Sequence, residues 1–334
     1  MADTQFDVLT IGNAIVDVIA PIDPGFLERE GMAEGIMHLV DAERSAYLYE
    51  RMPGQKRQVS GGSSANTAAG VASFGGRAAF IGKVAADPLG DVFADDLRQI
   101  GVHYSIGRLG EGPATARSMI LVSPGGERTM NTYLGACQQL TTADIKEAEI
   151  GAAAVTYMEG YLWDPPEAKK AFVLASHYAH KHERPTAFTL SDPFCVNRYR
   201  EEFLDLMRSK TIDYVFANIE EAKALYQTDS LHEAVQQIAR DCDLAAVTMG
   251  AQGAMAVHNG EIVTVPAFPV PQVVDATGAG DLFASGFLLA LARGRDLTTA
   301  LAAGCLAASE VISHIGARPI RALDQMALEH TVGI

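Results

Sequence analysis

Short apolar runs rich in β-branched residues alternate along this chain with longer amphipathic segments. The runs that indicate buried strands cover residues 6–11, 79–82, 153–157, 186–190, 212–217 and 244–249. Amphipathic patterns of helical period lie between most of them, at residues 92–100, 201–207 and 231–238. A repeated strand-then-helix order builds a mostly parallel sheet with helices on both faces. The pattern therefore predicts a three-layer α/β/α fold with ligands bound beyond the carboxyl ends of the strands.

Two segments interrupt this alternation and predict a second, smaller sheet. The first follows the first strand and is punctuated by proline and glycine; the second contains the alternating run 117–123, which is typical of a strand with one exposed face. We interpret both as a β-rich lid, with ordinary surface hairpins as the alternative. The predicted domains are an α/β core of residues 1–12, 41–104 and 137–334, and a lid of residues 13–40 and 105–136.

The charge balance and the cysteines exclude several classes of protein. The 334 residues include 41 Asp and Glu against 26 Lys and Arg, a net charge of −15. We therefore expect no basic surface for nucleic acid or an anionic membrane. The four cysteines lack the spacing of a metal or redox site, which predicts reduced, buried thiols. Arg293, Arg295 and Asp296 interrupt the most apolar late stretch, residues 282–306, and the acidic N-terminal residues are unlike a secretory signal. We expect a cytoplasmic protein.

A glycine-rich segment at residues 273–281 leads directly into an apolar helical pattern. The first N–H groups of a helix lack intrahelical partners, and the helix dipole is positive there. Gly278, Ala279 and Gly280 are therefore predicted to bind an anion such as a phosphate group. Asp281, in the first turn, could accept a proton from an attacking hydroxyl. The alternative is an ordinary capped helix whose carboxylate only complements the dipole.

A second glycine-rich segment, with the sequence SGGSSAN, lies after residue 59. Its glycines, Gly61 and Gly62, would let backbone amides reach a hydroxylated ligand, and Asn66 offers both a donor and an acceptor. Asn13 and Asp17 follow the first strand and could hold adjacent hydroxyls of a sugar. For the glycine-rich segment, the alternative is a tight turn before a small-residue helix. For Asn13 and Asp17, the alternative is a role in a loop or a helix cap.

The two glycine-rich segments, in this order, resemble the ribokinase-like (PfkB-type) family of carbohydrate and nucleoside kinases. Residues 61–76 resemble the family's first signature and residues 275–288 its second, although Ala276 stands where many members carry Thr or Pro. The sequence NIEE at 218–221 fits the family's Asn-x-x-Glu element. Over nearly the whole chain, the resemblance implies a ribokinase-like fold and an ATP-dependent phosphotransferase with an alcohol acceptor. It also implies Mg²⁺ and admits a monovalent cation such as K⁺.

Within the family, the members that phosphorylate adenosine are the most similar. The similarity covers the opening GNAIVD at 12–17, the long segment 26–52 and TLSDPF at 189–194. It implies phosphorylation of the 5′-hydroxyl of adenosine to AMP, a purine salvage reaction, by a monomer or homodimer. One alternative is a PfkB-type kinase of a free sugar such as ribose or fructose, or of inosine or guanosine. Another is a nucleotide-binding regulator that has lost turnover.

The resemblance also assigns roles to individual residues. The catalytic set is Asp281, Gly278, Ala279, Gly280 and Arg128. The substrate-binding set is Asn13, Asp17, Gly61, Gly62, Ser63, Asn66, Tyr161 and Phe194. The nucleotide-binding set is Asn218, Thr248, Gly250 and Gly253, and Glu221 is the metal residue, acting through water. Arg128 is expected to close over the transferred phosphate. Tyr161 is expected to stack on the purine, with core packing as the alternative.

Overall fold

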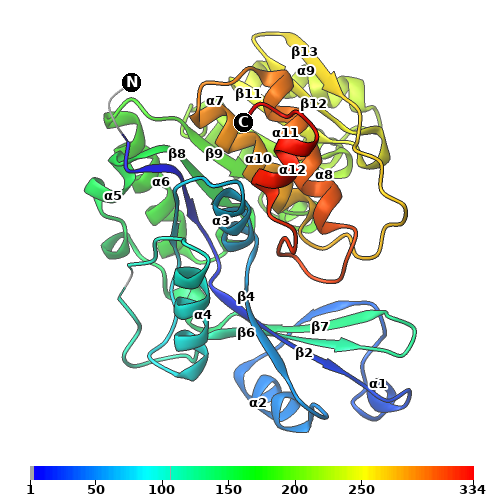
Figure 1. The fold of residues 1–334 in the computed structure, drawn as a ribbon. Helices are drawn as coiled ribbons and strands as arrows, with labels where there is room; N and C mark the ends of the chain where they lie inside the picture. The colour runs from blue at the N-terminus through cyan, green and yellow to red at the C-terminus, as the bar shows by residue number, and fades with distance from the viewer. Residues whose placement is uncertain (1–3, 106) are drawn as a thin grey trace.

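A sheet of eight strands forms the centre of the computed structural model, which describes residues 4–105 and 107–334 (Figure 1). Its spatial order is β13 (Glu261–Val265), β12 (Ala254–His258), β11 (Leu244–Thr248), β10 (Tyr214–Asn218), β9 (Thr186–Thr189), β8 (Ala153–Glu159), β1 (Phe6–Ile11) and β5 (Ala78–Ile81). The strands from β11 to β5 run parallel, whereas β12 and β13 are antiparallel. These six parallel strands coincide with the six predicted apolar runs, so the mostly parallel sheet is confirmed.

The helices pack in two groups against this sheet. One group comprises α3 (Ser63–Ser73), α10 (Ala279–Ala292), α11 (Leu297–Val311) and α12 (Leu323–Glu329). The other comprises α5 (Glu147–Gly151), α6 (Pro166–Lys181), α7 (Pro193–Arg208), α8 (Ile219–Tyr226) and α9 (Leu231–Asp241). Short 3₁₀ turns lie at Gly135–Gln139, Thr142–Asp144, Gly160–Leu162 and Gly250–Gln252. In the described part of the chain, no helix is both long enough and apolar enough to span a membrane.

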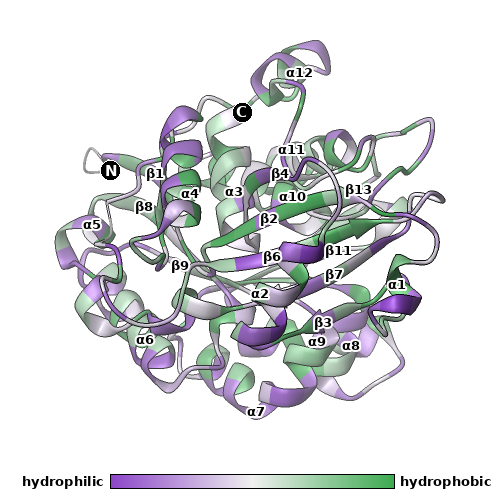
Figure 2. Ribbon diagram, turned by 90° about the horizontal axis from the view of Figure 1, so that it is seen from below, coloured by the Kyte–Doolittle hydropathy of each residue, from purple (hydrophilic) through white to green (hydrophobic). Residues whose placement is uncertain are grey.

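Local sequence explains where several helices begin. The helices α4 (Pro88–Gln99) and α7 both start with an Asp-Pro pair. Asp87 accepts a hydrogen bond from the Gly90 N–H at 2.8 Å, and a proline in the first turn loses no intrahelical bond. Figure 2 shows hydrophobic residues concentrated on inner strands such as β2, with hydrophilic residues on outer helices such as α7. All four cysteines are buried and free, as predicted.

A second sheet projects from the larger one (Figure 1). Its order is β3 (Met37–Leu39), β7 (Arg128–Tyr133), β6 (Ala116–Val122), β2 (Ile15–Pro21) and β4 (Arg57–Gly61). Two further helices belong to this region: α1 (Phe26–Arg29), which follows β2, and α2 (Ala42–Arg51), which packs on β6 and β7. The sequence placed residues 41–104 in the core, but β4 pairs antiparallel with β2. A five-residue strand of mixed polarity has no pattern that separates it from a loop. We keep the division into core and lid as a proposal, with β4 and α2 moved to the lid.

The expected exposed face of the run 117–123 is wrong. Strand β6 is the middle strand of the small sheet and is almost fully buried. On one side the Arg117 Nε donates to the Ser45 Oγ of α2 at 2.7 Å, while Ser118 and Ile120 on the other side line a cavity. The polar residues in the alternating pattern therefore mark a helix contact and a ligand-sized space, rather than solvent.

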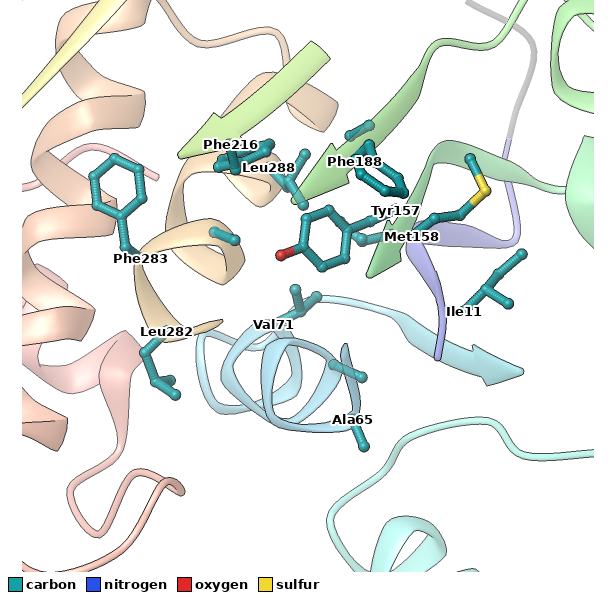
Figure 3. Packing of buried hydrophobic residues seen from close by; sticks show 14 of the residues in the cluster. Ile11, Ala65, Val71, Tyr157, Met158, Phe188, Phe216, Leu282, Phe283 and Leu288 are labelled. Carbon is teal, nitrogen blue, oxygen red and sulfur yellow. The ribbon is translucent and has the colours of Figure 1, made fainter. Parts of the chain in front are cut away.

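The helix α10 is buried along most of its length between α3, α11 and the larger sheet. Figure 3 shows aromatic side chains of the sheet and of α10 packed together above α3. The ring of Phe216 meets those of Tyr157 and Phe287 edge-on, with centroids 5.6 and 5.4 Å apart. On the α11 side, a Cβ added to Gly286 would lie 2.5 Å from the Ala303 carbonyl oxygen. This close packing fixes the position of the N-terminus of α10.

We expect Gly286→Ala to lower the free energy of unfolding by about 1–3 kcal/mol, because the added methyl group forces α10 and α11 apart. The matched control is Gly110→Ala, where an added Cβ meets nothing within 4 Å. Urea denaturation of both variants measures the difference. Equal stability of Gly286→Ala and wild type would show that the approach of these two helices is not tightly constrained.

Candidate active site

A cavity of 510 Å³ lies between the two sheets, within the size range of small-molecule sites. Its wall on the larger sheet comes from the segments after β8 and β9, the ends of β10 and β11, and the N-termini of α3 and α10. Its wall on the smaller sheet comes from β2, β6 and β7. Predicted site residues that line it are Asp17, Gly62, Ser63, Asn66, Tyr161, Asn218, Glu221, Thr248, Gly278, Ala279, Gly280 and Asp281.

The N-terminus of α10 leaves backbone donors at this cavity. Gly278 caps the helix with φ +82°, a left-handed conformation that favours glycine. The Ala279 N–H donates to the Ala276 carbonyl at 3.2 Å, so one of the three predicted amides is already used in a turn. The N–H groups of Gly278, Gly280 and Asp281 have no acceptor among the residues that the structure describes. These amides can receive an anion.

The Asp281 carboxylate connects α10 to the start of α3. Its Oδ1 accepts from the Ser63 Oγ at 2.6 Å, and its Oδ2 accepts from the Asn66 Nδ2 at 3.0 Å. Burial raises the pKa of Asp281, whereas the two hydrogen bonds and the charge of Arg318 lower it. Each carboxylate oxygen can accept more than one hydrogen bond. Asp281 is therefore held in place with capacity to accept a proton.

Arg318 is a site residue that the sequence analysis missed. It lies in the loop between α11 and α12, and its Nε donates to the Asn66 Oδ1 at 2.7 Å. Its Nη2 donates to the Ser60 Oγ at 2.9 Å. An isolated arginine in a loop, 252 residues from its partner in the chain, carries no sequence signal. Only the tertiary fold brings it beside Asn66.

Asp17 and Asn13 occupy different positions relative to the cavity. Asp17, on β2, lines it, and burial raises the pKa of Asp17 to about 6, partly opposed by Arg128 and Arg318. Asn13 is buried behind the wall, and its Oδ1 has no hydrogen-bond partner in the described part of the chain. Beside Asp17, a Cβ on Gly61 would lie 2.7 Å from a carboxylate oxygen. Gly61 thus gives the aspartate room and does not itself line the cavity.

The buried carboxylate Glu159 is a second site residue that the sequence did not predict. It accepts from the Asn13 N–H at 2.8 Å, the Ser64 N–H at 2.7 Å and the Ser64 Oγ at 2.5 Å. Burial raises the pKa of Glu159 to about 7. The side chain joins the segment after β1 to the first turn of α3, and so fixes both predicted sugar-binding segments. It lies just beyond the predicted strand 153–157, where nothing in the sequence distinguishes it from a surface residue.

Asn218 and Glu221 form a capping box at the start of α8. The Glu221 N–H donates to the Asn218 Oδ1 at 2.9 Å, and the Glu221 carboxylate accepts from the Asn218 N–H and Nδ2 at 3.0 and 2.6 Å. This reciprocal arrangement gives the Asn-x-x-Glu pattern a structural role. Burial raises the pKa of Glu221 to about 7. No cluster of three His, Cys, Asp or Glu side chains within 4–105 and 107–334 could hold a metal by itself.

Arg128, on β7, reaches from the small sheet to the core. Its Nη1 donates to the Asp275 carboxylate and lies 3.4 Å from the Thr277 Oγ. Asp275 also accepts from the Thr277 N–H at 3.0 Å and the Gly316 N–H at 2.9 Å, so it organises the turn before α10. Arg128 therefore lies next to the anion-binding turn, as a phosphate-contacting residue requires, but its guanidinium is already paired.

The remaining predicted residues divide into two groups. Tyr161 and Thr248, the latter at the end of β11, line the cavity. The Tyr161 hydroxyl donates to the Ser191 carbonyl at 3.2 Å. Phe194 is 66% exposed and lies outside the cavity, because the first turn of α7 turns it outward. Gly250 and Gly253 also lie outside the cavity, in the turn between β11 and β12.

Comparisons with known proteins give a consistent family. A family model described as pfkB family carbohydrate kinase matches residues 36–323. The crystal structure of adenosine kinase from Sinorhizobium meliloti is 54% identical, covers 98% of this chain and 99% of its own, and has a TM-score of 0.90. A probable sugar kinase from Rhizobium etli is 53% identical with the same coverage and a TM-score of 0.91. Adenosine kinase 1 of Arabidopsis thaliana is 26% identical over 95% of this chain and 97% of its own length.

We expect Asp17→Asn to stabilise the folded protein at pH 8 by on the order of 1 kcal/mol, because it removes a desolvated charge. The folded-state pKa of about 6 lies above the ordinary value of 3.8, so the ionised carboxyl destabilises the fold at high pH. At pH 4 the advantage of the variant should disappear, since the carboxyl is then protonated in the folded protein. Urea denaturation at both pH values measures this, and a variant less stable at pH 8 would contradict it.

Proposed function

This chain belongs to the pfkB family of carbohydrate kinases, and from that premise we propose that it transfers the γ-phosphoryl group of ATP to the 5′-hydroxyl of adenosine. The products are AMP and ADP. The relatives named adenosine kinase from Arabidopsis thaliana and Sinorhizobium meliloti match nearly the whole chain, at 26% and 54% identity. An acceptor alcohol and a triphosphate must meet in one cavity for this reaction, and the 510 Å³ cavity has a wall suited to each.

The observation that carries the proposal is the position of Asp281. Its carboxylate faces the cavity beside the free amides of Gly278 and Gly280, and both of its oxygens are held by neutral donors. As the acceptor oxygen attacks the phosphorus, its proton passes to Asp281. The amides stabilise the charge that spreads over the phosphoryl oxygens, without reorganising during the reaction. The bond from phosphorus to the β,γ-bridging oxygen breaks, and ADP leaves.

The small-sheet wall of the cavity suits a planar base joined to a sugar. Ile15, Ile120 and Met130 give it an apolar surface, and Tyr161 lies in the wall contributed by the larger sheet. An aromatic ring stacks on a base with about 1–3 kcal/mol of stabilisation. Asp17 is the acidic group of the small-sheet wall and can accept hydrogen bonds from ribose hydroxyls. A bare sugar would leave much of the apolar surface without a partner.

The Mg²⁺ that the family implies fits this site only if phosphate oxygens of the nucleotide supply some of its ligands. Glu221 lines the cavity, but both carboxylate oxygens already accept from Asn218. Mg²⁺ commonly keeps several waters and binds phosphates with one or two carboxylates, so Glu221 would hold it through water. When bound, the ion neutralises charge on the phosphates. A monovalent cation such as K⁺ is admitted only by the resemblance.

The second candidate function is phosphorylation of a free sugar. It is favoured by the 53% identity to a probable sugar kinase from Rhizobium etli. Asp17, Asp281 and the amides of α10 would serve a sugar as well as a nucleoside, because both present a primary hydroxyl. The apolar wall and Tyr161 separate the two, since they have a role only toward a base.

We expect adenosine to give AMP with a kcat/KM at least about tenfold above those for inosine, guanosine, ribose and fructose, because a single lost contact costs roughly 1–3 kcal/mol. An ADP-release assay with ATP and Mg²⁺ compares them, and chromatography identifies the product. 5′-Deoxyadenosine is the matched control, since it keeps the base and lacks the acceptor oxygen. Faster turnover of ribose or fructose than of adenosine would favour the sugar kinase.

We expect Asp281→Asn to lower kcat by on the order of 10²–10⁴-fold, because the amide cannot take the proton of the acceptor hydroxyl. The affinity for adenosine should change only a few-fold, since Ser63 and Asn66 keep the shape of the site. Steady-state kinetics give kcat, and calorimetry gives the adenosine affinity. A kcat close to that of wild type would remove Asp281 from the role of general base.

A further inference from the structure

The Arg318 guanidinium lies next to the catalytic machinery without lining the cavity itself. It is partly buried, and its charge acts on both Asp17 and Asp281. Its two side-chain hydrogen bonds point in different directions: Nε donates to the Asn66 Oδ1 at 2.7 Å and Nη2 donates to the Ser60 Oγ at 2.9 Å. A planar guanidinium with donors in a fixed fork can hold two such acceptors at once. Neither hydrogen bond involves a reacting atom of the proposed phosphoryl transfer.

The first contact determines which end of the Asn66 amide faces the catalytic carboxylate. Arginine only donates hydrogen bonds and a carboxylate only accepts them. With the Asn66 oxygen on Arg318, the amide NH₂ must point to the Asp281 Oδ2, 3.0 Å away. Rotation of the amide by 180° would set oxygen against carboxylate oxygen and NH₂ against guanidinium. Arg318 therefore excludes the rotamer that would repel Asp281.

The second contact anchors the guanidinium. The Ser60 hydroxyl accepts from Arg318 and donates its own proton to the Asp96 carboxylate of α4, which also accepts the Ser60 N–H at 3.1 Å. Each hydrogen bond in this chain has a single possible direction, because arginine can only donate and the serine has one proton. The loop between α11 and α12 is thus tied through Arg318 to β4, α4 and α3.

We propose that Arg318 is a positioning residue of the phosphoryl-transfer site, which orients the Asn66 amide toward Asp281 and places a positive charge near the Asp281 carboxylate. This inference rests on the proposed function, in which Asp281 receives the proton of the acceptor hydroxyl. Arg318 acts on the reaction through Asn66 and through its charge, without touching the reacting atoms.

The charges around the two carboxylates support the electrostatic part of this role. The positive charge of Arg318, in the α11–α12 loop, lowers the pKa of Asp281. Glu159, at the end of β8, is an acidic neighbour of Asp281. The positive charges of Arg318 and of Arg128, on β7, both lower the pKa of Asp17. The Arg128 guanidinium is itself paired with the Asp275 carboxylate. Of these neighbours, Arg318 is the cation that acts on both acids, and its loss would favour their protonated forms.

The ionisable hydroxyls near Asp281 do not replace this charge. Tyr157, on β8, and Tyr161, after it, both have their pKa raised by burial and by nearby acidic groups that include Asp281. They stay neutral at the pH values at which carboxyl groups titrate. The acid limb of the activity profile is therefore expected to report the carboxyl groups, of which Asp17 and Asp281 respond to the charge of Arg318.

The test compares Arg318→Met, Arg318→Lys and the control Arg321→Met by kcat and KM from pH 5 to 9. Arg321 lies in the same loop, and its exposed side chain pairs with Glu329 on the surface. For Arg318→Met we expect kcat to fall about 10- to 100-fold and the acid limb of kcat/KM to move up by about one pH unit. For Arg318→Lys we expect the wild-type acid limb and a kcat about 3- to 10-fold low, because lysine keeps the charge but lacks the fork. Arg321→Met should match wild type.

The outcomes separate this inference from the proposed function. A wild-type protein that forms no AMP from adenosine overturns the proposed function itself. If wild type forms AMP, a wild-type acid limb in folded Arg318→Met overturns the role of the charge. If Arg318→Met does not fold, as thermal unfolding would show, Arg318→Lys decides alone: wild-type kcat, or an acid limb moved as far as one pH unit, contradicts the proposal.

Discussion

The hydrogen bonds from Ser63 and Asn66 to Asp281 are the contacts on which the site depends. They join the first turn of α3 to the first turn of α10, two segments that lie far apart in the chain. Both helices pack on the same side of the large sheet, so the backbone donors of Gly278 and Gly280 face the same cavity as the carboxylate. Proton acceptor and anion donors are thus placed together before any ligand binds, which is the preorganisation that transfer reactions need.

Carboxyl groups are buried in and around this site, and the fold must tolerate them. Burial raises the pKa of Asp17 to about 6 and those of Glu159 and Glu221 to about 7. Ionising such groups near neutral pH opposes folding, and proteins commonly accept this loss of stability at functional sites. An anionic substrate must also enter a protein with a net charge of −15. Local donors make this possible, above all the amides of α10 and the nearby Arg128.

Sequence patterns predicted the parallel sheet and the residues at the N-terminus of α10, because buried strands and a glycine-led helix have strong local signals. They missed Arg318 and Glu159, whose roles come from contacts with residues distant in the chain. They also placed Phe194 at the substrate, although a resemblance in sequence does not fix the direction in which a helix turns its first residues. The pattern 218–221 was recognised, but its capping role became visible only from the hydrogen bonds.

The most direct test is a crystal structure with adenosine and a non-hydrolysable ATP analogue. We expect the 5′-oxygen of adenosine to lie within about 2.6–3.2 Å of an Asp281 carboxylate oxygen. The γ-phosphate should lie between the 5′-oxygen and the amides of Gly280 and Asp281. The base should lie between Tyr161 and the apolar face of the small sheet. A 5′-oxygen directed away from Asp281, or phosphates bound away from the start of α10, would contradict the role of Asp281 and of the α10 amides in phosphoryl transfer.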